Sequence, residues 1–143
     1  MMSLAADIGG TYSRLAWLDD GTVPAGDPQV FRNAEFGSLE DVISHGLAER
    51  GRSAEPIGHM VLALPGPVQA DPILLTNIDW QLRRDALQSR FAVTRLTIVN
   101  DFQAAALGAT AEPIDRLKVL NSAIPDDGAV VIAGAGTGLG MAW

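Results

Sequence analysis

The chain has 143 residues and a formal net charge of −7, because 17 Asp and Glu residues outnumber 10 Lys and Arg residues. Nucleic-acid binding requires clustered cations that neutralise backbone phosphates, so this balance argues against a nucleic-acid partner. With 48% hydrophobic and 19% charged residues, the composition predicts one ordered domain with an ordinary core. The absence of cysteine excludes disulfides, thiolate catalysis and cysteine-ligated metal sites.

The N-terminal segment lacks the features of a secretory signal. No basic residue precedes its apolar run, and Asp7 interrupts that run early. The longest uncharged stretch, residues 128–143, is shorter than the roughly 20 apolar residues of a membrane-spanning helix. We therefore expect a cytoplasmic protein that does not bind a membrane.

Residues 1–50 predict an antiparallel meander followed by a helix. Short apolar or alternating runs separated by Gly- and Pro-containing turns predict three strands, at residues 3–8, 13–18 and 29–32. The first turn contains Gly9, Gly10 and Thr11. A capping-box pattern that begins at Ser38 predicts a helix over residues 38–50.

The rest of the chain alternates between strands and helices. A continuous apolar run at residues 57–64 is typical of a strand buried on both faces, paired in parallel with an earlier strand. The elements predicted after it are a short strand at 73–76, a helix at 81–91, a buried strand at 96–99, a helix at 101–109, strands at 117–120 and 129–133, and a glycine loop at 134–140. This order predicts an α/β fold with a mixed sheet, in which ligands bind where loops leave the strand ends.

The turn after the first strand reads Asp7-Ile8-Gly9-Gly10-Thr11. Two adjacent glycines let the backbone amides approach an anion, the threonine adds a hydroxyl donor, and the aspartate can hold Mg²⁺ through water. A simple hairpin with glycines in left-handed geometry explains the same residues equally well.

Asn100-Asp101 follows the strand at 96–99. A carboxylate placed there can accept a proton from a substrate hydroxyl, and the neighbouring amide can bind hydroxyl groups. Asn and Asp are also preferred helix caps, so a purely structural role is an alternative.

The glycine loop at 134–140 lacks the glycine spacing of a dinucleotide fingerprint and the lysine of a P-loop. Its amides suit a phosphate, and a tight hairpin is the alternative. In the loop at 76–80, Asn77 and Trp80 suit a sugar, although Trp80 is as well explained as a core residue. His45 and His59 are interpreted as structural, because neither has a histidine partner at metal-site spacing.

Four segments occur in an order and spacing that match a known family. They are Asp7-Ile8-Gly9-Gly10-Thr11 with Arg14, Leu75-Thr76-Asn77 with Trp80, Val99-Asn100-Asp101-Phe102 with Ala104, and Gly134-Ala135-Gly136-Thr137-Gly138-Leu139-Gly140. Together they resemble bacterial glucokinases, within the superfamily of actin, sugar kinases and heat-shock-70 ATPases. The resemblance implies an actin-like ATPase (ribonuclease H-like) fold, with a mixed sheet flanked by helices. It implies transfer of phosphate from ATP to the 6-hydroxyl of glucose.

The resemblance also implies site residues. The ATP phosphates are bound by Ala6, Asp7, Ile8, Gly9, Gly10, Thr11, Gly136, Thr137 and Gly138, and Asp7 holds Mg²⁺ through water. Glucose is bound by Asn100, Asp101 and Asn77, with Asp101 as the catalytic base. The partners it implies are glucose, ATP and, in the full enzyme, a second copy in a homodimer.

The sequence departs from the family pattern at Pro65, where alanine is usual, and at Tyr12, where asparagine is common. The resemblance divides the chain into a small lobe at 1–110 and the start of a second lobe at 111–143. A glutamate and a histidine that family members use beyond the second phosphate motif lie outside these residues. We therefore expect an N-terminal portion of a glucokinase that has little or no activity by itself.

Two other functions are compatible with parts of this pattern. A non-catalytic sugar- or nucleotide-sensing module of the related kinase–repressor family has a similar glycine–threonine motif and aspartate, but no basic helix-turn-helix is present here. An actin-like assembly or chaperone ATPase shares the phosphate motifs but does not need the pairs Thr76-Asn77 and Asn100-Asp101.

Overall fold

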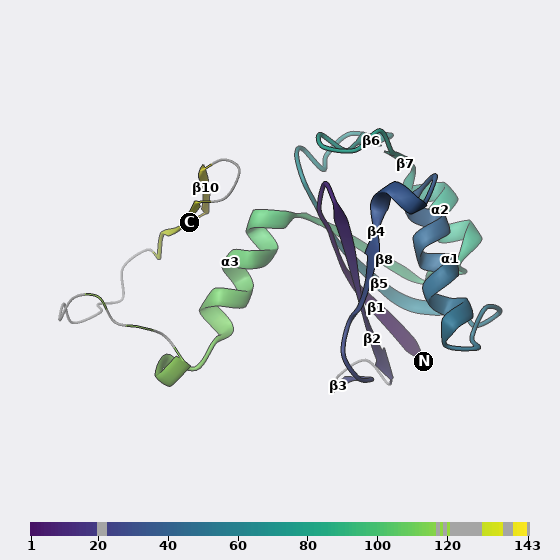
Figure 1. Ribbon diagram of the computed structural model, residues 1–143, viewed down its shortest axis with the longest axis horizontal. Helices are drawn as coiled ribbons and strands as arrows, with labels where there is room; N and C mark the ends of the chain where they lie inside the picture. Colours follow the sequence, from purple (N-terminus) through teal and green to yellow (C-terminus); the bar gives the residue numbers. More distant parts are fainter. Residues whose placement is uncertain (20–22, 117, 119, 121–129, 136–138, 143) are drawn as a thin grey trace. The chain divides into compact units, whose positions relative to one another are not determined.

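The computed structural model describes residues 1–19, 23–116, 118, 120, 130–135 and 139–142. They belong to two compact units, Met1–Asp101 and Phe102–Trp143 (Figure 1). The elements of the first unit are β1 (Met2–Ile8), β2 (Tyr12–Asp19), β3 (Val23–Pro24), β4 (Gln29–Arg32), a 3-10 turn (Asn33–Glu35), α1 (Leu39–Glu49), β5 (Ile57–Leu64), β6 (Ile73–Leu74), β7 (Gln81–Leu82), α2 (Arg84–Arg90) and β8 (Arg95–Asn100). Those of the second unit are α3 (Asp101–Ala111), which starts at the boundary, a 3-10 turn (Ile114–Arg116), β9 (Ile132–Ala135) and β10 (Leu139–Ala142).

A six-stranded mixed sheet forms the centre of the first unit, in the order β3-β2-β1-β5-β8, with β4 also paired to β2. β1 and β2 form an antiparallel hairpin, and β4 pairs antiparallel with β2. β5 lies parallel to β1 on one side and to β8 on the other. The predicted meander and the predicted parallel crossover are therefore confirmed.

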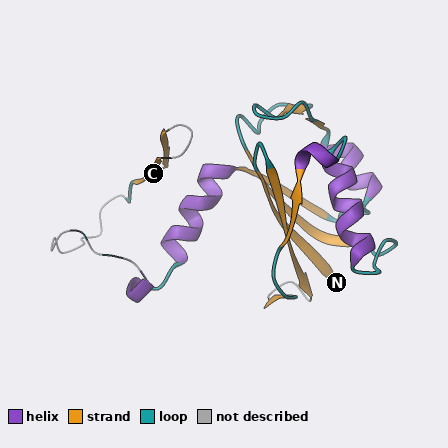
Figure 2. Cartoon of the chain, viewed as in Figure 1, coloured by secondary structure: helices purple, strands orange, loops and turns teal. Residues whose placement is uncertain are grey.

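α1 and α2 cover the same face of this sheet (Figure 2). Alternate residues of β1, among them Leu4 and Ile8, are buried toward that face, as are Met60 and Leu62 of β5. Burial of each such side chain contributes about 1.5–3 kcal/mol. The prediction that β5 is buried on both faces holds only in part, because His59 and Val61 on the opposite face are half-buried.

α1 begins and ends where the sequence predicts. The hydroxyl oxygen of Ser38 accepts a hydrogen bond from the backbone N–H of Asp41 at 3.2 Å, which satisfies one of the unpaired amides of the first turn. Gly51 follows the last turn with a φ of +66°, a conformation that glycine adopts without steric cost. None of the helices in the described residues has the length and apolar character needed to cross a bilayer.

The structure corrects several predicted boundaries. The helix predicted over 81–91 begins only at Arg84, because Gln81 and Leu82 pair with β6 as a two-residue strand. The strand at 96–99 is half-buried rather than buried. The connection between the last two strands is shorter than the predicted glycine loop at 134–140, because Gly134 and Gly140 are paired within the strands. Residues 117, 119 and 129 of the last predicted strands lie outside the described residues, and Lys118 and Leu120 are not in a strand.

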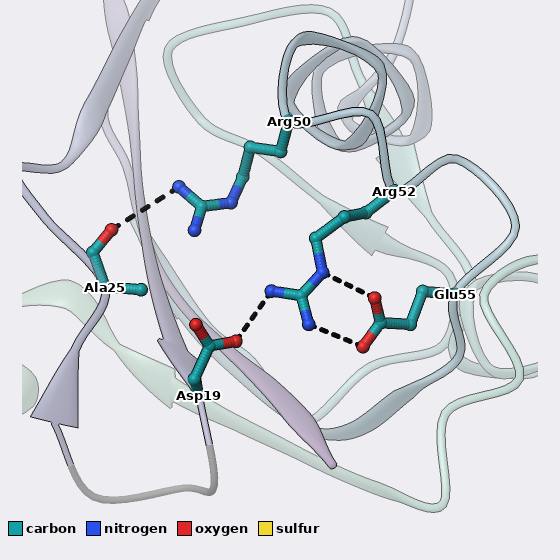
Figure 3. A network of polar contacts seen from close by, with 5 residues as sticks. All are labelled: Asp19, Ala25, Arg50, Arg52 and Glu55. Carbon is teal, nitrogen blue, oxygen red and sulfur yellow. Dashed lines mark hydrogen bonds and ion pairs between the residues drawn. The ribbon is translucent and has the colours of Figure 1, made fainter.

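A polar network joins the end of β2 to the turn after α1 (Figure 3). The guanidinium group of Arg52 donates a hydrogen bond to Asp19 Oδ1 at 2.6 Å. It also donates to both carboxylate oxygens of Glu55, and the distance to Oε1 is 2.6 Å. These hydrogen bonds from Arg52 lower the pKa of both carboxyl groups below their usual range and raise the pKa of Arg52. Arg50 donates to the Ala25 carbonyl beside this network at 3.5 Å.

The network predicts a pH-dependent contribution to stability. Because the carboxyl pKa values are lower in the folded chain than in the unfolded one, the contribution is present above the unfolded value of roughly 4 and is lost as the pH falls through the folded values. Arg52→Met should therefore lower the Tm at pH 7 and lower it less at pH 3. Arg83→Met, which removes only a local pair with Asp85, should change the Tm less at pH 7. Equal losses from Arg52→Met at both pH values would contradict this account.

Candidate active site

Three strand ends meet at one edge of the sheet. Because β1, β5 and β8 run parallel, their last residues, Ile8, Leu64 and Asn100, end at the same side. The register pairs Asp7 with Ala63 and Leu64 with Asn100. The loops that leave this edge carry the first two sequence motifs, as expected for a ligand-binding edge of an α/β sheet.

The turn between β1 and β2, residues 9–11, is the first of these loops, and we call it the glycine turn. It is closed by a hydrogen bond from the Gly9 N–H to the Tyr12 carbonyl at 2.9 Å. Asp7 and Arg14, which face each other across the hairpin, form an ion pair at 3.2 Å with about half of each side chain exposed. The predicted hairpin is confirmed, and it leaves the Asp7 carboxylate accessible to solvent.

The loop at 75–80 lies against the glycine turn. A Cβ atom on Gly10 would lie 2.7 Å from the Asn77 Cβ, so glycine is required at position 10 for this approach. The loop is closed by a hydrogen bond from the Leu75 N–H to the Trp80 carbonyl at 3.2 Å. Trp80 is 6% exposed and belongs to the core, which favours its interpretation as a buried anchor over that of a sugar-stacking surface.

The turn at residues 65–67 joins the third strand end to the same loop. Asn100 Nδ2 donates a hydrogen bond to the Gly66 carbonyl at 3.2 Å. Gly66 has a φ of +88°, and a Cβ atom there would lie 2.9 Å from Thr76 Cγ2. Asn100, the 65–67 turn, the 75–80 loop and the glycine turn therefore form one continuous set of contacts.

Asp101 follows Asn100 directly and begins α3. It is half-buried and stands at the carboxyl end of β8, on the edge that also carries the glycine turn. The first unit thus brings together seven of the residues singled out in the sequence, namely Asp7, Gly9, Gly10, Thr11, Asn77, Asn100 and Asp101. Ala6 and Ile8 belong to the same segment but are buried, with their side chains in the core.

The second glycine motif belongs to the second unit. Gly136, Thr137 and Gly138 lie outside the described residues, and β9 and β10 on either side of them pair antiparallel. A Cβ atom on Gly134 would lie 2.7 Å from Phe102 Cε2, so β9 packs against the first turn of α3. The described residues contain no group of three or more His, Asp or Glu side chains suited to a metal ion.

Comparison with known proteins assigns the chain to a family. A family model described as glucokinase matches residues 4–143. The chain belongs to the glucokinase family. A glucokinase of Mesorhizobium japonicum is 32% identical over 140 residues, which are 97% of this chain and 40% of that protein. The chain therefore spans less than half the length of this curated glucokinase.

Solved glucokinase structures have the same fold. The crystal structure of a glucokinase from an Antarctic psychrotroph is 28% identical, with a TM-score of 0.81 over 98% of this chain and 45% of that one. A ROK family glucokinase from Streptomyces griseus, solved in complex with glucose and AMPPNP, is 22% identical, with a TM-score of 0.50 over 76% of this chain and 36% of that one. The chain thus has the α/β fold of actin-like ATPases that the resemblance implied.

Two features of the site could not be read from the sequence. Arg14 is part of the first glucokinase motif, but its pairing with Asp7 depends on the hairpin register, which the sequence leaves open. Asn33 is a buried polar residue whose side chain reaches the glycine turn from the end of β4. The sequence signal for Asn33 is no more than a polar residue directly after a short predicted strand.

The close approach at Gly10 generates a stability prediction. Gly10→Ala should force Asn77 away and lower the free energy of unfolding by about 1–3 kcal/mol, the usual cost of overpacking. Chemical denaturation measures the loss, and the backbone resonances of the 75–80 loop should shift in the same variant. Gly108→Ala in α3, where a Cβ meets open space, serves as control and should raise stability by up to about 1 kcal/mol. A Gly10→Ala chain as stable as the parent would contradict the contact.

Proposed function

We propose that this chain serves the ATP-dependent phosphorylation of glucose at its 6-hydroxyl, which yields glucose 6-phosphate and ADP. The observation that carries the proposal is the contact between the 75–80 loop and the glycine turn at Gly10. It brings a candidate sugar-binding amide, Asn77, next to a candidate phosphate-binding turn, and Asn100 is tied to the same loop through Gly66. A kinase needs this juxtaposition, because the acceptor hydroxyl must lie next to the γ-phosphate.

In the proposed reaction, Asp101 accepts the proton of the glucose 6-hydroxyl as the oxygen attacks the γ-phosphorus. A new bond forms between this oxygen and phosphorus, and the bond from phosphorus to the β,γ-bridging oxygen breaks, so that ADP leaves. Asn100 and Asn77 orient the sugar through hydrogen bonds to its hydroxyl groups. The amides of the glycine turn, with those of Gly136, Thr137 and Gly138, bind the phosphates.

The described residues suit a Mg²⁺ ion that is bound together with the nucleotide. Mg²⁺ is usually held by one or two carboxylates, several waters and the substrate phosphates, so a single accessible carboxylate suffices. Asp7 is such a group, with about half of its side chain exposed. When bound, Mg²⁺ would neutralise charge on the phosphates, and Asp7 would hold it through water.

The proposed reaction also needs a second lobe, of which these 143 residues contain only the start. The chain corresponds to 40% of the length of the Mesorhizobium japonicum glucokinase, and catalysis by two-lobed kinases requires closure of both lobes on the substrates. We assign residues 1–110 to the small lobe and residues 111–143 to the start of the second. The full enzyme is proposed to be a cytoplasmic homodimer.

The role of Asp101 predicts a large loss of turnover. In the full-length enzyme, Asp101→Ala should lower kcat by about 10²–10⁴, the usual contribution of a general base, and change the glucose Kd by less than about fivefold. Steady-state ADP formation and glucose titration measure the two quantities. Asp27→Asn, in an exposed turn, is the charge-matched control and should leave both unchanged. Unaltered turnover in Asp101→Ala would remove Asp101 as the base.

The purified 143-residue chain should bind glucose and Mg²⁺-AMPPNP weakly, and it should form no ADP from Mg²⁺-ATP at a measurable rate. The reason is that the second lobe, which excludes water from the reacting groups, contributes only its first residues to this chain. Calorimetric titration and a coupled ADP assay measure binding and turnover separately. Glucose-dependent ADP production at the rate of a complete glucokinase would contradict this expectation.

A further inference from the structure

Asn33 is an unusual core residue because it is polar, 1% exposed and adjacent to the proposed active site. It follows β4 directly and opens the 3-10 turn Asn33–Glu35. Among the described residues, Asn33 and Ser13 are the polar side chains that are fully buried. Burial of an amide is unfavourable unless its hydrogen bonds are satisfied, so its partners indicate why it is there.

Three hydrogen bonds join Asn33 to the glycine turn and to Ser13, which lies just beyond that turn in β2. The Asn33 backbone N–H donates to the Thr11 carbonyl at 2.9 Å. Its side-chain Nδ2 donates to the Gly9 carbonyl at 2.8 Å. Its Oδ1 accepts from the Ser13 hydroxyl at 2.7 Å, which orients the amide so that Nδ2 faces Gly9.

These bonds determine which way the turn presents its amides. The peptide bond between Gly9 and Gly10 is trans, so the Gly9 carbonyl and the Gly10 N–H point in opposite directions. Because the carbonyl points to buried Asn33, the Gly10 N–H points away from the core. In the described part of the chain no backbone carbonyl accepts a hydrogen bond from the Gly10 amide.

We propose that Asn33 is a positioning residue for phosphate binding: by holding the Gly9 and Thr11 carbonyls inward, it keeps the glycine turn in the conformation that presents the Gly10 amide to a phosphate of the nucleotide. Two adjacent glycines are conformationally free, and without such a restraint the peptide can rotate and present a carbonyl, which repels an anion. A turn fixed in advance avoids that reorganisation. The inference rests on the proposed function, which makes the ligand a nucleoside triphosphate.

A purely structural role for Asn33 makes a different prediction. Loss of a buried hydrogen-bond network lowers stability and affects every ligand of the folded chain alike. A positioning role lowers affinity for the nucleotide and spares the sugar. Asn100 is held by the Gly66 carbonyl, and the loop that carries Asn77 is anchored by Trp80 in the core. The ratio of the two affinities therefore separates the two roles.

The test uses three variants of the 143-residue chain, with Mg²⁺-AMPPNP and glucose titrated separately. Asn33→Leu keeps the number and branching of the side-chain heavy atoms but removes both side-chain hydrogen bonds. It should raise the Kd for Mg²⁺-AMPPNP by about tenfold, with the glucose Kd changed by less than about twofold. Ser13→Ala removes only the bond that orients the amide and should cause a smaller rise in the same Kd. Ser44→Ala is the control. It removes the bond from the Ser44 hydroxyl to the Glu40 carbonyl on α1 and the bond that the hydroxyl accepts from Arg90, and it should change neither Kd.

An Asn33→Leu chain that folds and keeps its nucleotide Kd, or loses affinity for both ligands equally, would overturn the proposal. If Asn33→Leu does not fold, Ser13→Ala decides by the same ratio. Hydrogen exchange of the Gly9 amide, which closes the turn by donating to the Tyr12 carbonyl, separates this inference from the proposed function when it is measured in the ligand-free chain. If the parent chain binds no Mg²⁺-AMPPNP, the proposed function fails. Exchange at least tenfold faster in Asn33→Leu than in Ser44→Ala would then still support the positioning role, and equal exchange would overturn it.

Discussion

Parallel pairing of β5 with both β1 and β8 is the constraint on which the candidate site depends. An antiparallel neighbour would carry its loop to the opposite edge, but three parallel strands deliver the glycine turn, the 65–67 turn and Asn100 to one edge. The pairing is maintained by the apolar face packed against α1 and α2. Stability of the core and placement of the site are therefore consequences of the same sheet.

The site loops are fixed from the core side by a few buried anchors. Trp80 is held in the core and closes the 75–80 loop, so the exposed Asn77 is carried on a loop with a rigid base. Asn33 plays the corresponding part for the glycine turn, with a polar anchor instead of an apolar one. Glycine at positions 10 and 66 then allows the loops to touch, since a side chain at either position would collide with the 75–80 loop.

Much of the fold is predictable because strand and helix periods are local. Each strand of the meander, the helix capped by Ser38 and the apolar strand at 57–64 follow from patterns within about a dozen residues. The sequence pattern wrongly predicts a helix at Gln81 and Leu82. They form a strand only by pairing with the two residues of β6, and so short a strand has no periodic signal in the sequence. The candidate site residues are identified by motif. The contact of Gly10 with Asn77 and the hydrogen bond from Asn100 to Gly66 join segments far apart in the chain, so they required the structure.

The net negative charge of the chain restricts how the site can attract phosphates. A chain with a net charge of −7 repels a nucleotide at long range, so the attraction that holds phosphates must be local. Backbone amides supply it without adding side-chain charge, but they do so only when the peptide planes are turned the right way. Arg14 offsets the charge of Asp7 beside the turn, and the network around Asn33 determines how the turn's peptide planes face. Local orientation of dipoles thus takes the place that a basic surface has in other phosphate-binding proteins.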